Sequence, residues 1–332
     1  MYSIIPPKVE LTIDQLDQLA ERFKAIRHPG DLAALLKADA AQLKKLATKP
    51  HYSVFSIPKP GGARRVIHNP YPDLKEVQQA LNLYLQAAYY QLKPPAAYGF
   101  IPRPNDEPRP RNIYTNALVH ANSEWVLNLD MADFFHTVTT RHLGWIYRQL
   151  FEFQEPLSNQ LIAICTCNGV LPMGAPTSPV LSNLACLPLD MDLQNFAFGH
   201  DANYTRYVDD LTLSFNAHPG MEVTETIRQM VEKQGFALNE GKIKLTAKAD
   251  HPEVTGLILK SPKPDVSDRF VKSLKKDIRL LRRLTSAAMM QRGIFHAFVL
   301  DKLRRSIQGQ VQFLGFIRGT TGRQYRKLSA VL

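Results

Sequence analysis

The alternation of apolar and polar residues predicts a β-hairpin whose strands are residues 204–207 and 211–215. Both runs are rich in aromatic, threonine and aliphatic side chains at strand spacing, a composition typical of strands. Val208, Asp209 and Asp210 are therefore expected at the tip of the hairpin, where two neighbouring carboxylates face outwards.

A second strand-like run covers residues 125–135. It is apolar as far as Asp130, where the chain turns towards a helix. Carboxylates that end separate strands can share hard divalent cations, and two Mg²⁺ ions about 4 Å apart form the clamp used in phosphoryl transfer. The pattern therefore predicts a metal site at Asp130, Asp209 and Asp210.

Helical periodicity and turn residues predict most of the remaining elements. A capping box, Thr12 to Gln15, opens the first helix. The other expected elements are helices at 31–36, 40–47, 74–90, 223–234 and 267–285, a helix start near Asn116 to His120, and a strand at 236–245. In the helix at 267–285, Val271, Leu274, Ile278 and Leu281 share one apolar face.

Two glycine- and proline-rich segments carry further candidate residues. Residues 51–67 alternate like strands on both sides of a Pro-Gly-Gly turn, so this hairpin is expected to place Lys59, Arg64 and Arg65 around its tip. Residues 169–183 form a loop that opens a helix. Within it, Gly174 is expected to let a ligand approach the backbone, and Ser178 and Asn183 offer hydrogen bonds to it.

Composition indicates a globular protein with a basic C-terminal region. The chain has 332 residues, 45% of them hydrophobic, and a formal net charge of +11. Residues 260–332 hold 17 Lys or Arg against 4 Asp or Glu, whereas residues 1–259 hold 24 against 26. Such a concentrated basic region favours a polyanionic partner. No run approaches the ~20 apolar residues that span a bilayer, and no signal peptide is visible, so we expect a cytoplasmic protein with no membrane partner.

The order of these motifs resembles the palm of reverse transcriptases. Asp130, the loop at 169–183 and Tyr207-Val-Asp-Asp210 follow one another as in that family, and the resemblance covers about residues 52–259. It implies an α+β, right-hand polymerase fold with fingers, palm and thumb. The expected regions are a helical N-terminal extension at 1–50, fingers at 51–122, a palm at 123–260 with interleaved boundaries, and a basic thumb at 261–332.

The resemblance also implies roles for single residues. Asp130, Asp209 and Asp210 would be catalytic and hold two Mg²⁺ ions. The Asn239-x-x-Lys242 match makes Lys242 the candidate general acid, with Lys244 as the alternative. Contacts to the incoming deoxynucleoside triphosphate would come from Lys59, Arg65 or its neighbour Arg64, Phe135 against the sugar 2′ position, and the loop at Gly174.

Two shorter motifs resemble elements of retron reverse transcriptases. They are Asn116-Ala-Leu-Val-His120 and Val254-Thr255-Gly256, both in the expected positions. The resemblance implies that these residues bind RNA and that the enzyme makes a branched, RNA-linked single-stranded DNA. The template and primer would be one cognate, structured noncoding RNA. An antiphage role and an effector protein partner are implied as well.

The basic face of the expected helix at 267–285 predicts a thumb that grips RNA backbone through Lys275, Arg279 and Arg282. Two alternatives stay open from sequence. One is a group II intron-type or other bacterial reverse transcriptase. The other is a non-catalytic RNA-binding protein with a polymerase fold.

Overall fold

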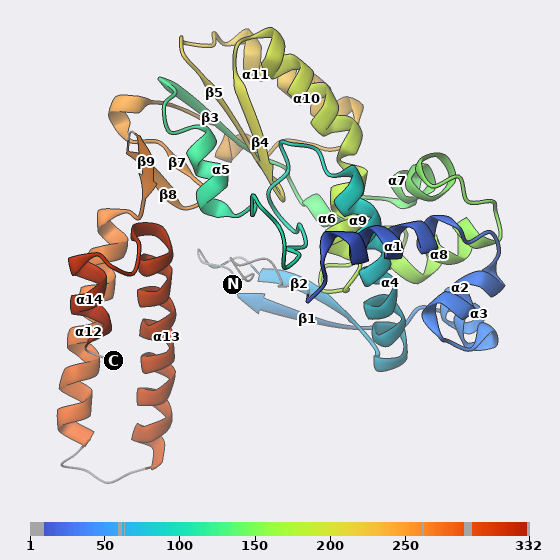
Figure 1. The fold of residues 1–332 in the computed structure, drawn as a ribbon, viewed down its shortest axis with the longest axis horizontal. Coiled ribbons are helices and arrows are strands. Elements are labelled where there is room, and N and C mark those ends of the chain that lie inside the picture. Colours follow the sequence, from blue (N-terminus) through green and yellow to red (C-terminus); the bar gives the residue numbers. More distant parts are fainter. Residues whose placement is uncertain (1–9, 59–61, 63, 261, 289–293, 331–332) are drawn as a thin grey trace.

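A computed structural model describes residues 10–58, 62, 64–260, 262–288 and 294–330 and shows the α+β architecture expected from the sequence (Figure 1). The strands are β1 (Tyr52–Pro58), β2 (Arg64–Pro70), β3 (Trp125–Asp130), β4 (Asn203–Tyr207), β5 (Asp210–Phe215), β6 (Lys244–Ala247), β7 (Glu253–Val254), β8 (Leu257–Lys260) and β9 (Lys263–Asp265). The helices are α1 (Ile13–Lys24), α2 (Pro29–Leu36), α3 (Ala40–Thr48), α4 (Pro72–Leu92), α5 (Ile113–Val119), α6 (Phe134–Thr137), α7 (Thr140–Gly144), α8 (Leu157–Cys165), α9 (Ser178–Ala185), α10 (Leu187–Gly199), α11 (Glu222–Lys233), α12 (Asp268–Ala288), α13 (Ile294–Arg318) and α14 (Arg323–Ser329).

The central sheet, which we call the palm sheet, has the strand order β4-β5-β3-β6 and is antiparallel throughout. The predicted hairpin is confirmed, because β4 and β5 flank a turn at Val208 and Asp209. The register sets Asp130 directly opposite Asp210. The palm sheet thus brings together the ends of the two acid-bearing runs.

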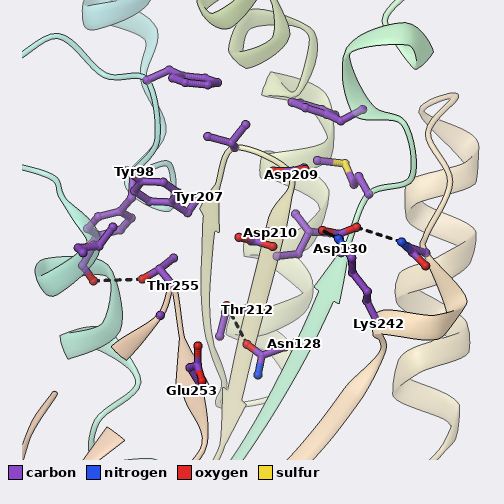
Figure 2. A pocket seen from close by; sticks show the side chains of 18 of the residues that line it. Tyr98, Asn128, Asp130, Tyr207, Asp209, Asp210, Thr212, Lys242, Glu253 and Thr255 are labelled. Atoms are coloured by element: carbon purple, nitrogen blue, oxygen red, sulfur yellow. Dashed lines mark hydrogen bonds and ion pairs between the residues drawn. The ribbon is translucent and has the colours of Figure 1, made fainter. Parts of the chain in front are cut away.

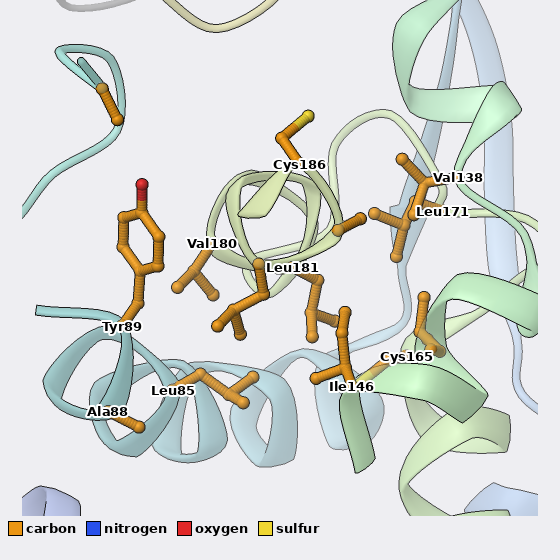
Figure 3. Packing of buried hydrophobic residues seen from close by; sticks show 14 of the residues in the cluster. Leu85, Ala88, Tyr89, Val138, Ile146, Cys165, Leu171, Val180, Leu181 and Cys186 are labelled. Atoms are coloured by element: carbon orange, nitrogen blue, oxygen red, sulfur yellow. The ribbon is translucent and has the colours of Figure 1, made fainter. Parts of the chain in front are cut away.

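Helices α4 and α9 form the middle of the main core beside the palm sheet. Figure 3 shows Leu85 and Tyr89 of α4 facing Val180 and Leu181 of α9. All four side chains are buried. Fully burying one such aliphatic side chain is worth about 1.5–3 kcal/mol, so this packing fixes the helix that follows the loop at 169–183.

Helices α1 and α2 pack against α4, and α3 packs against α8. The capping box predicted at Thr12 and Gln15 is present, with the Thr12 side chain accepting from the Gln15 backbone N–H and the Gln15 side chain accepting from that of Thr12. Leu16, Ala20 and Phe23 are the buried positions of α1, which agrees with the predicted helical periodicity.

The C-terminal part, which we call the thumb, consists of α12, α13 and α14 and extends from the small sheet β7-β8-β9 (Figure 1). The predicted apolar face of α12 is confirmed, since Val271, Leu274, Ile278 and Leu281 are all buried in a separate core. Among the described residues no helix combines the length and apolar character needed to cross a membrane.

Two local predictions were wrong. The strand expected over residues 236–245 begins only at Lys244, because Glu240–Lys242 form a 3₁₀ turn that brings Lys242 beside the end of β3. His120 was expected near a helix start, but it caps the C-terminal end of α5, since the helix begins upstream at an Asn112 cap.

Candidate active site

Three carboxylates gather where β3 meets the β4–β5 hairpin. Figure 2 shows Asp130, Asp209 and Asp210 at this point. Asp130 is the last residue of β3, and Asp209 lies in the hairpin turn, where its carbonyl accepts a hydrogen bond from the Met131 N–H at 3.0 Å. The sheet register, rather than a flexible loop, therefore positions the acidic residues.

Lys242 and Asn239 hold the carboxylate of Asp130. The Lys242 ammonium lies 2.7 Å from one Asp130 oxygen, and the Asn239 side-chain amide donates to the other at 3.4 Å. The backbone N–H of Asn239 also donates to the Asp130 carbonyl at 2.7 Å. The hydrogen bond from the Lys242 ammonium to the Asp130 carboxylate raises the pKa of Lys242, which keeps the ammonium protonated at neutral pH.

The other two acids, Asp209 and Asp210, both have raised pKa values. Although the Asp210 side chain is open to the cleft, partial removal from water and the charges of Asp209 and Asp130 raise its pKa to about 7. Removal from water, with the charge of Asp130 as a further contribution, raises the pKa of Asp209 as well. Like charges held together in this way are stabilised by a nearby cation.

The donor set fits a hard divalent cation, because it consists of carboxylate oxygens facing solvent-filled space. A ready-made coordination shell is not formed, however. Within the described ranges no three acidic, histidine or cysteine side chains are arranged to hold a metal ion. In this structure the Lys242 ammonium supplies the positive charge beside Asp130 instead.

The acids lie in a cleft of about 1390 Å³ between the palm sheet, the hairpin β1–β2, which we call the fingers hairpin, and the thumb. Arg65 and Phe135 line it near the acids, and Arg305 and Phe313 of α13 line the thumb side. A space of this size, with walls from three separate parts of the chain, suits a large substrate better than a small metabolite.

Two of the three predicted nucleotide contacts outside the loop at 169–183 can be placed. Arg65 lines the cleft, whereas Arg64 bonds the Ser56 side chain on the hairpin, so the geometry favours Arg65 of the two. Lys59 lies outside the described residues. Phe135 borders the cleft with only 7% of its surface exposed, and its ring lies 6.3 Å from that of Phe100.

The role expected for the loop at 169–183 is corrected by the structure. Gly174 has φ 119°, and a Cβ there would lie 2.9 Å from Ile67 Cγ2 and 3.1 Å from the His68 carbonyl oxygen. The fingers hairpin, not a ligand, therefore requires this glycine. Ser178 and Asn183 are buried, and their side chains donate to backbone carbonyls of the protein, so neither is available to a nucleotide.

Several residues predicted to bind RNA are buried. His120 has no exposed surface, and its ring nitrogens hydrogen-bond with Ser214 at 2.8 Å and Thr205 at 2.7 Å. Asn116 and Val254 are each 1% exposed. Direct RNA contact by these three residues was a wrong prediction, because their side chains fasten α5 to the palm sheet and to the small sheet of the thumb base.

Thr255 and Gly256, in contrast, line the cleft. The Thr255 hydroxyl donates to the Ile113 carbonyl at 3.2 Å and accepts from the Asn116 amide at 3.5 Å. The two short motifs, separated by more than a hundred residues, therefore meet in space, and only the second presents a surface to the cleft.

The thumb cations chosen from sequence lie outside the cleft, and their contact with RNA stays a prediction. Lys275, Arg279 and Arg282 are exposed on α12, but none of them lines the cleft. Phe270 and Ser273 are the residues of α12 that do. At 100° per residue, the three cations fall on a different side of the helix. Arg305 of α13 is a thumb cation that does line the cleft.

Sequence reasoning also missed a buried ion pair behind the hairpin. Arg206 is 1% exposed and Asp190 has no exposed surface, and their side chains join through two hydrogen bonds of 2.8 and 2.6 Å. Arg206 donates further to the Asn183 amide oxygen and the Val208 carbonyl. The sequence did offer a signal for this ion pair, because Asp190 and Arg206 each stand within a largely apolar run.

Comparisons with known proteins agree with this arrangement. The profile of a family described as reverse transcriptase (RNA-dependent DNA polymerase) matches residues 57–317. The retron Ec86 reverse transcriptase of Escherichia coli is 27% identical, covering 76% of each chain. The retron Ec83 reverse transcriptase of the same organism is 30% identical, covering 65% of this chain and 71% of the relative.

Other matches cover less of the relative. The retron Mx162 reverse transcriptase of Myxococcus xanthus is 29% identical over 67% of this chain, and the chain spans 50% of that protein's length. A solved structure of telomerase from Candida albicans with a fragment of telomeric RNA is similar at a TM-score of 0.45 and 12% identity, covering 87% of this chain and 64% of that chain.

The burial of His120 predicts a specific acid response. Burial lowers the pKa of this ring to about 3, whereas an unfolded histidine has a pKa near 6.5. Stability from the neutral ring is therefore complete above about pH 6.5 and is lost as the pH falls towards 3, by up to about 1.4 kcal/mol per pH unit. His120→Gln should be less stable than wild type at pH 7.5, by about 1–3 kcal/mol, and the difference should narrow by pH 4.5.

Denaturant unfolding at several pH values measures this narrowing. His51→Gln, at an exposed histidine, is the matched control and should show a constant difference from wild type. A constant difference in His120→Gln as well would mean that the ring takes up its proton at the same pH in the folded and in the unfolded protein, which would contradict the lowered pKa.

Proposed function

Because this chain belongs to the retron-type bacterial reverse transcriptases, which are RNA-dependent DNA polymerases, we propose that it copies a cognate, structured noncoding RNA into a branched, RNA-linked single-stranded DNA. The observation that carries the proposal is the cluster of Asp130, Asp209 and Asp210 at the wall of a cleft large enough for a nucleic acid. The family uses divalent metal ions, and we assign two Mg²⁺ ions to this cluster.

The carboxylates would hold two Mg²⁺ ions, which supply activation of the primer hydroxyl and charge neutralisation at the departing pyrophosphate. The protein's own groups do the rest. The protonated Lys242 ammonium is placed to donate a proton to the leaving pyrophosphate. Arg65 contacts the triphosphate from the fingers, and Thr255 with Gly256 contacts the nucleic acid beyond the acids.

The alternative to this proposal is a non-catalytic protein that binds RNA with the same fold. The acidic cluster favours an enzyme, because a surface that only binds RNA gains nothing from three neighbouring acids, two of which have pKa values raised by removal from water and by each other's charge. The Asp209→Asn variant separates the two functions.

Asp209→Asn is expected to abolish DNA synthesis while the fold and RNA affinity persist. The change removes one ligand charge at constant volume, and relief of like-charge repulsion favours the folded state. Primer extension with Mg²⁺ and deoxynucleotides measures activity, and filter binding measures RNA affinity. Asp201→Asn, at an exposed acid just before β4, is the matched control. Substantial extension by Asp209→Asn would falsify the metal assignment.

Phe135→Ala is expected to admit ribonucleotides. The Phe135 ring borders the cleft close to the acids, so it would occupy the space that a 2′-hydroxyl needs. The measurement is the ratio of kcat/KM for a deoxynucleotide to that for its ribonucleotide. This ratio should fall by at least about tenfold, the effect of a steric difference of roughly 1.4 kcal/mol. Phe198→Ala, at a 90% exposed phenylalanine, should leave the ratio unchanged, and an unchanged ratio in Phe135→Ala places the gate elsewhere.

The branched product itself is the third expectation. Retron-type priming would begin from an internal 2′-hydroxyl of the folded RNA. This hydroxyl has to reach the acids in the cleft, so the rest of the folded RNA needs a docking surface outside the cleft. The exposed cations of α12 that do not line the cleft suit such docking. Expression with the native upstream noncoding region should yield short single-stranded DNA joined to RNA, and an enzyme specific for 2′,5′ linkages should shift it on a denaturing gel.

The docking surface adds a second arm to that experiment. Replacing Lys275, Arg279 and Arg282 with alanine should lower the yield of branched DNA but not the extension of a supplied primer in the cleft. If all DNA depends on a supplied primer and carries no branch, the retron-type product is wrong, while the polymerase assignment stands.

In cells, we propose that the complex restrains an effector protein in antiphage defence, so phage resistance conferred by the locus should disappear with Asp209→Asn.

A further inference from the structure

The turn that carries Asp209 has an unfavourable backbone conformation. Val208 has φ 64°, in the left-handed region, which is a genuine outlier for a β-branched residue. Such a conformation costs on the order of 1–3 kcal/mol and persists only when surrounding contacts fix it. The contacts that fix Val208 therefore also determine where Asp209, the next residue, is held.

Gly99 lies close against Val208. A Cβ added at Gly99 would lie 2.5 Å from Val208 Cγ2 and 2.7 Å from the Val208 backbone nitrogen. Both distances are below normal van der Waals contact, and the second involves backbone that cannot rotate away. Only glycine lets this segment pass directly beneath the catalytic turn.

The segment around Gly99 is itself fastened to β4. The Tyr98 N–H donates to the Arg206 carbonyl at 2.8 Å, and the Arg206 N–H donates to the Ala96 carbonyl at 2.8 Å. Ala97 and Arg206 form a parallel bridge. The position of Gly99 relative to the strand that leads into the turn is thus set by backbone hydrogen bonds.

Asn183 and Arg206 close the arrangement from the other side. The Asn183 amide donates to the Gly99 carbonyl at 2.9 Å, and its oxygen accepts from the Arg206 guanidinium at 2.8 Å. The same guanidinium nitrogen donates to the Val208 carbonyl at 3.1 Å. Gly99, Asn183, Arg206 and Val208 are therefore joined by one chain of hydrogen bonds beside the turn.

We infer that Gly99 is a positioning residue for catalysis, because its close approach to Val208 holds the strained turn that presents Asp209 to the reacting nucleotide. The inference rests on the proposed function, since it gives Asp209 a catalytic role. The segment also reaches the sugar pocket, because the ring of the next residue, Phe100, lies against that of Phe135.

The test is single-nucleotide incorporation by Gly99→Ala on an RNA template with a DNA primer. The added methyl group must displace the turn, and a misplacement of about 1 Å can cost about 100-fold in rate. We expect kcat to fall on the order of 10- to 100-fold, with the dissociation constant for template–primer within about twofold of wild type. Gly144→Ala is the matched control, because a Cβ there meets nothing within 4 Å.

Hydrogen exchange supplies a readout besides activity. In Gly99→Ala the amides of the β4–β5 hairpin should exchange faster, while those of α4 should keep the wild-type rate. A merely structural role would instead speed exchange across the whole core. Gly99→Ala that is folded, with kcat within about twofold of Gly144→Ala, overturns the inference.

A double variant keeps the test valid if Gly99→Ala does not fold. Val208→Ala removes Cγ2 and with it the 2.5 Å contact, but the contact with the Val208 nitrogen stays. Gly99→Ala/Val208→Ala should therefore have a lower kcat than Val208→Ala alone, and equal kcat values overturn the inference. The two possible failures can be distinguished by the Asp209→Asn variant. If the proposed function is wrong, Asp209→Asn is active. If only the role of Gly99 is wrong, Asp209→Asn is inactive and Gly99→Ala keeps its kcat.

Discussion

The buried ion pair between Arg206 and Asp190 is the interaction on which the active site depends most. Both side chains are removed from water, which costs several kcal/mol per ion unless the geometry compensates. Here both Asp190 oxygens are bonded, one of them also by the Tyr204 hydroxyl at 2.8 Å. Removing one partner of such a pair costs about 3–5 kcal/mol. Because the same guanidinium also bonds the carbonyl of Val208, the pair couples the packing of α10 to the turn that carries Asp209. The helix behind the palm sheet is therefore part of the catalytic geometry.

Charge is distributed so that a polyanion is attracted near a site that is itself acidic. Lys242 is ion-paired with Asp130, and the pKa values of Asp209 and Asp210 are raised first by removal from water and then by the negative charges of their neighbours. A nucleic acid would be repelled by such a cluster alone. The thumb offsets the repulsion, since residues 260–332 carry the net positive charge of the whole chain. Exposed cations attract a polyanion without reading its sequence, so the charge of the chain is divided between a basic C-terminal region and an acidic cluster on the palm sheet.

What the sequence predicted well was local, and what it predicted poorly required knowledge of neighbours. Asp130, Asp209 and Asp210 were found because strand periodicity places them at strand ends, and antiparallel pairing then brings these ends together. The apolar face of α12 followed from helical spacing in the same way. Gly174 was assigned to a ligand because a glycine pattern shows that something approaches, but not whether it is a nucleotide or the hairpin residue Ile67. His120 was assigned to RNA because a polar ring in a motif does not disclose that Ser214 and Thr205 enclose it. For the cations of α12 the sequence showed the exposed face but not its position, since periodicity defines the faces of a helix but not which one borders a cleft.

The buried members of the two short motifs have a physical explanation that does not involve RNA contact. Helix α5 is fastened at its C-terminal end to β4 and β5 of the palm sheet by His120, and near its middle to the turn at Thr255 by Asn116. That turn belongs to the small sheet from which the thumb extends. One short helix therefore connects the palm sheet, which carries the carboxylates, to the sheet at the base of the thumb. The buried residues of the two motifs join these two parts, and Thr255 and Gly256 line the cleft beside them.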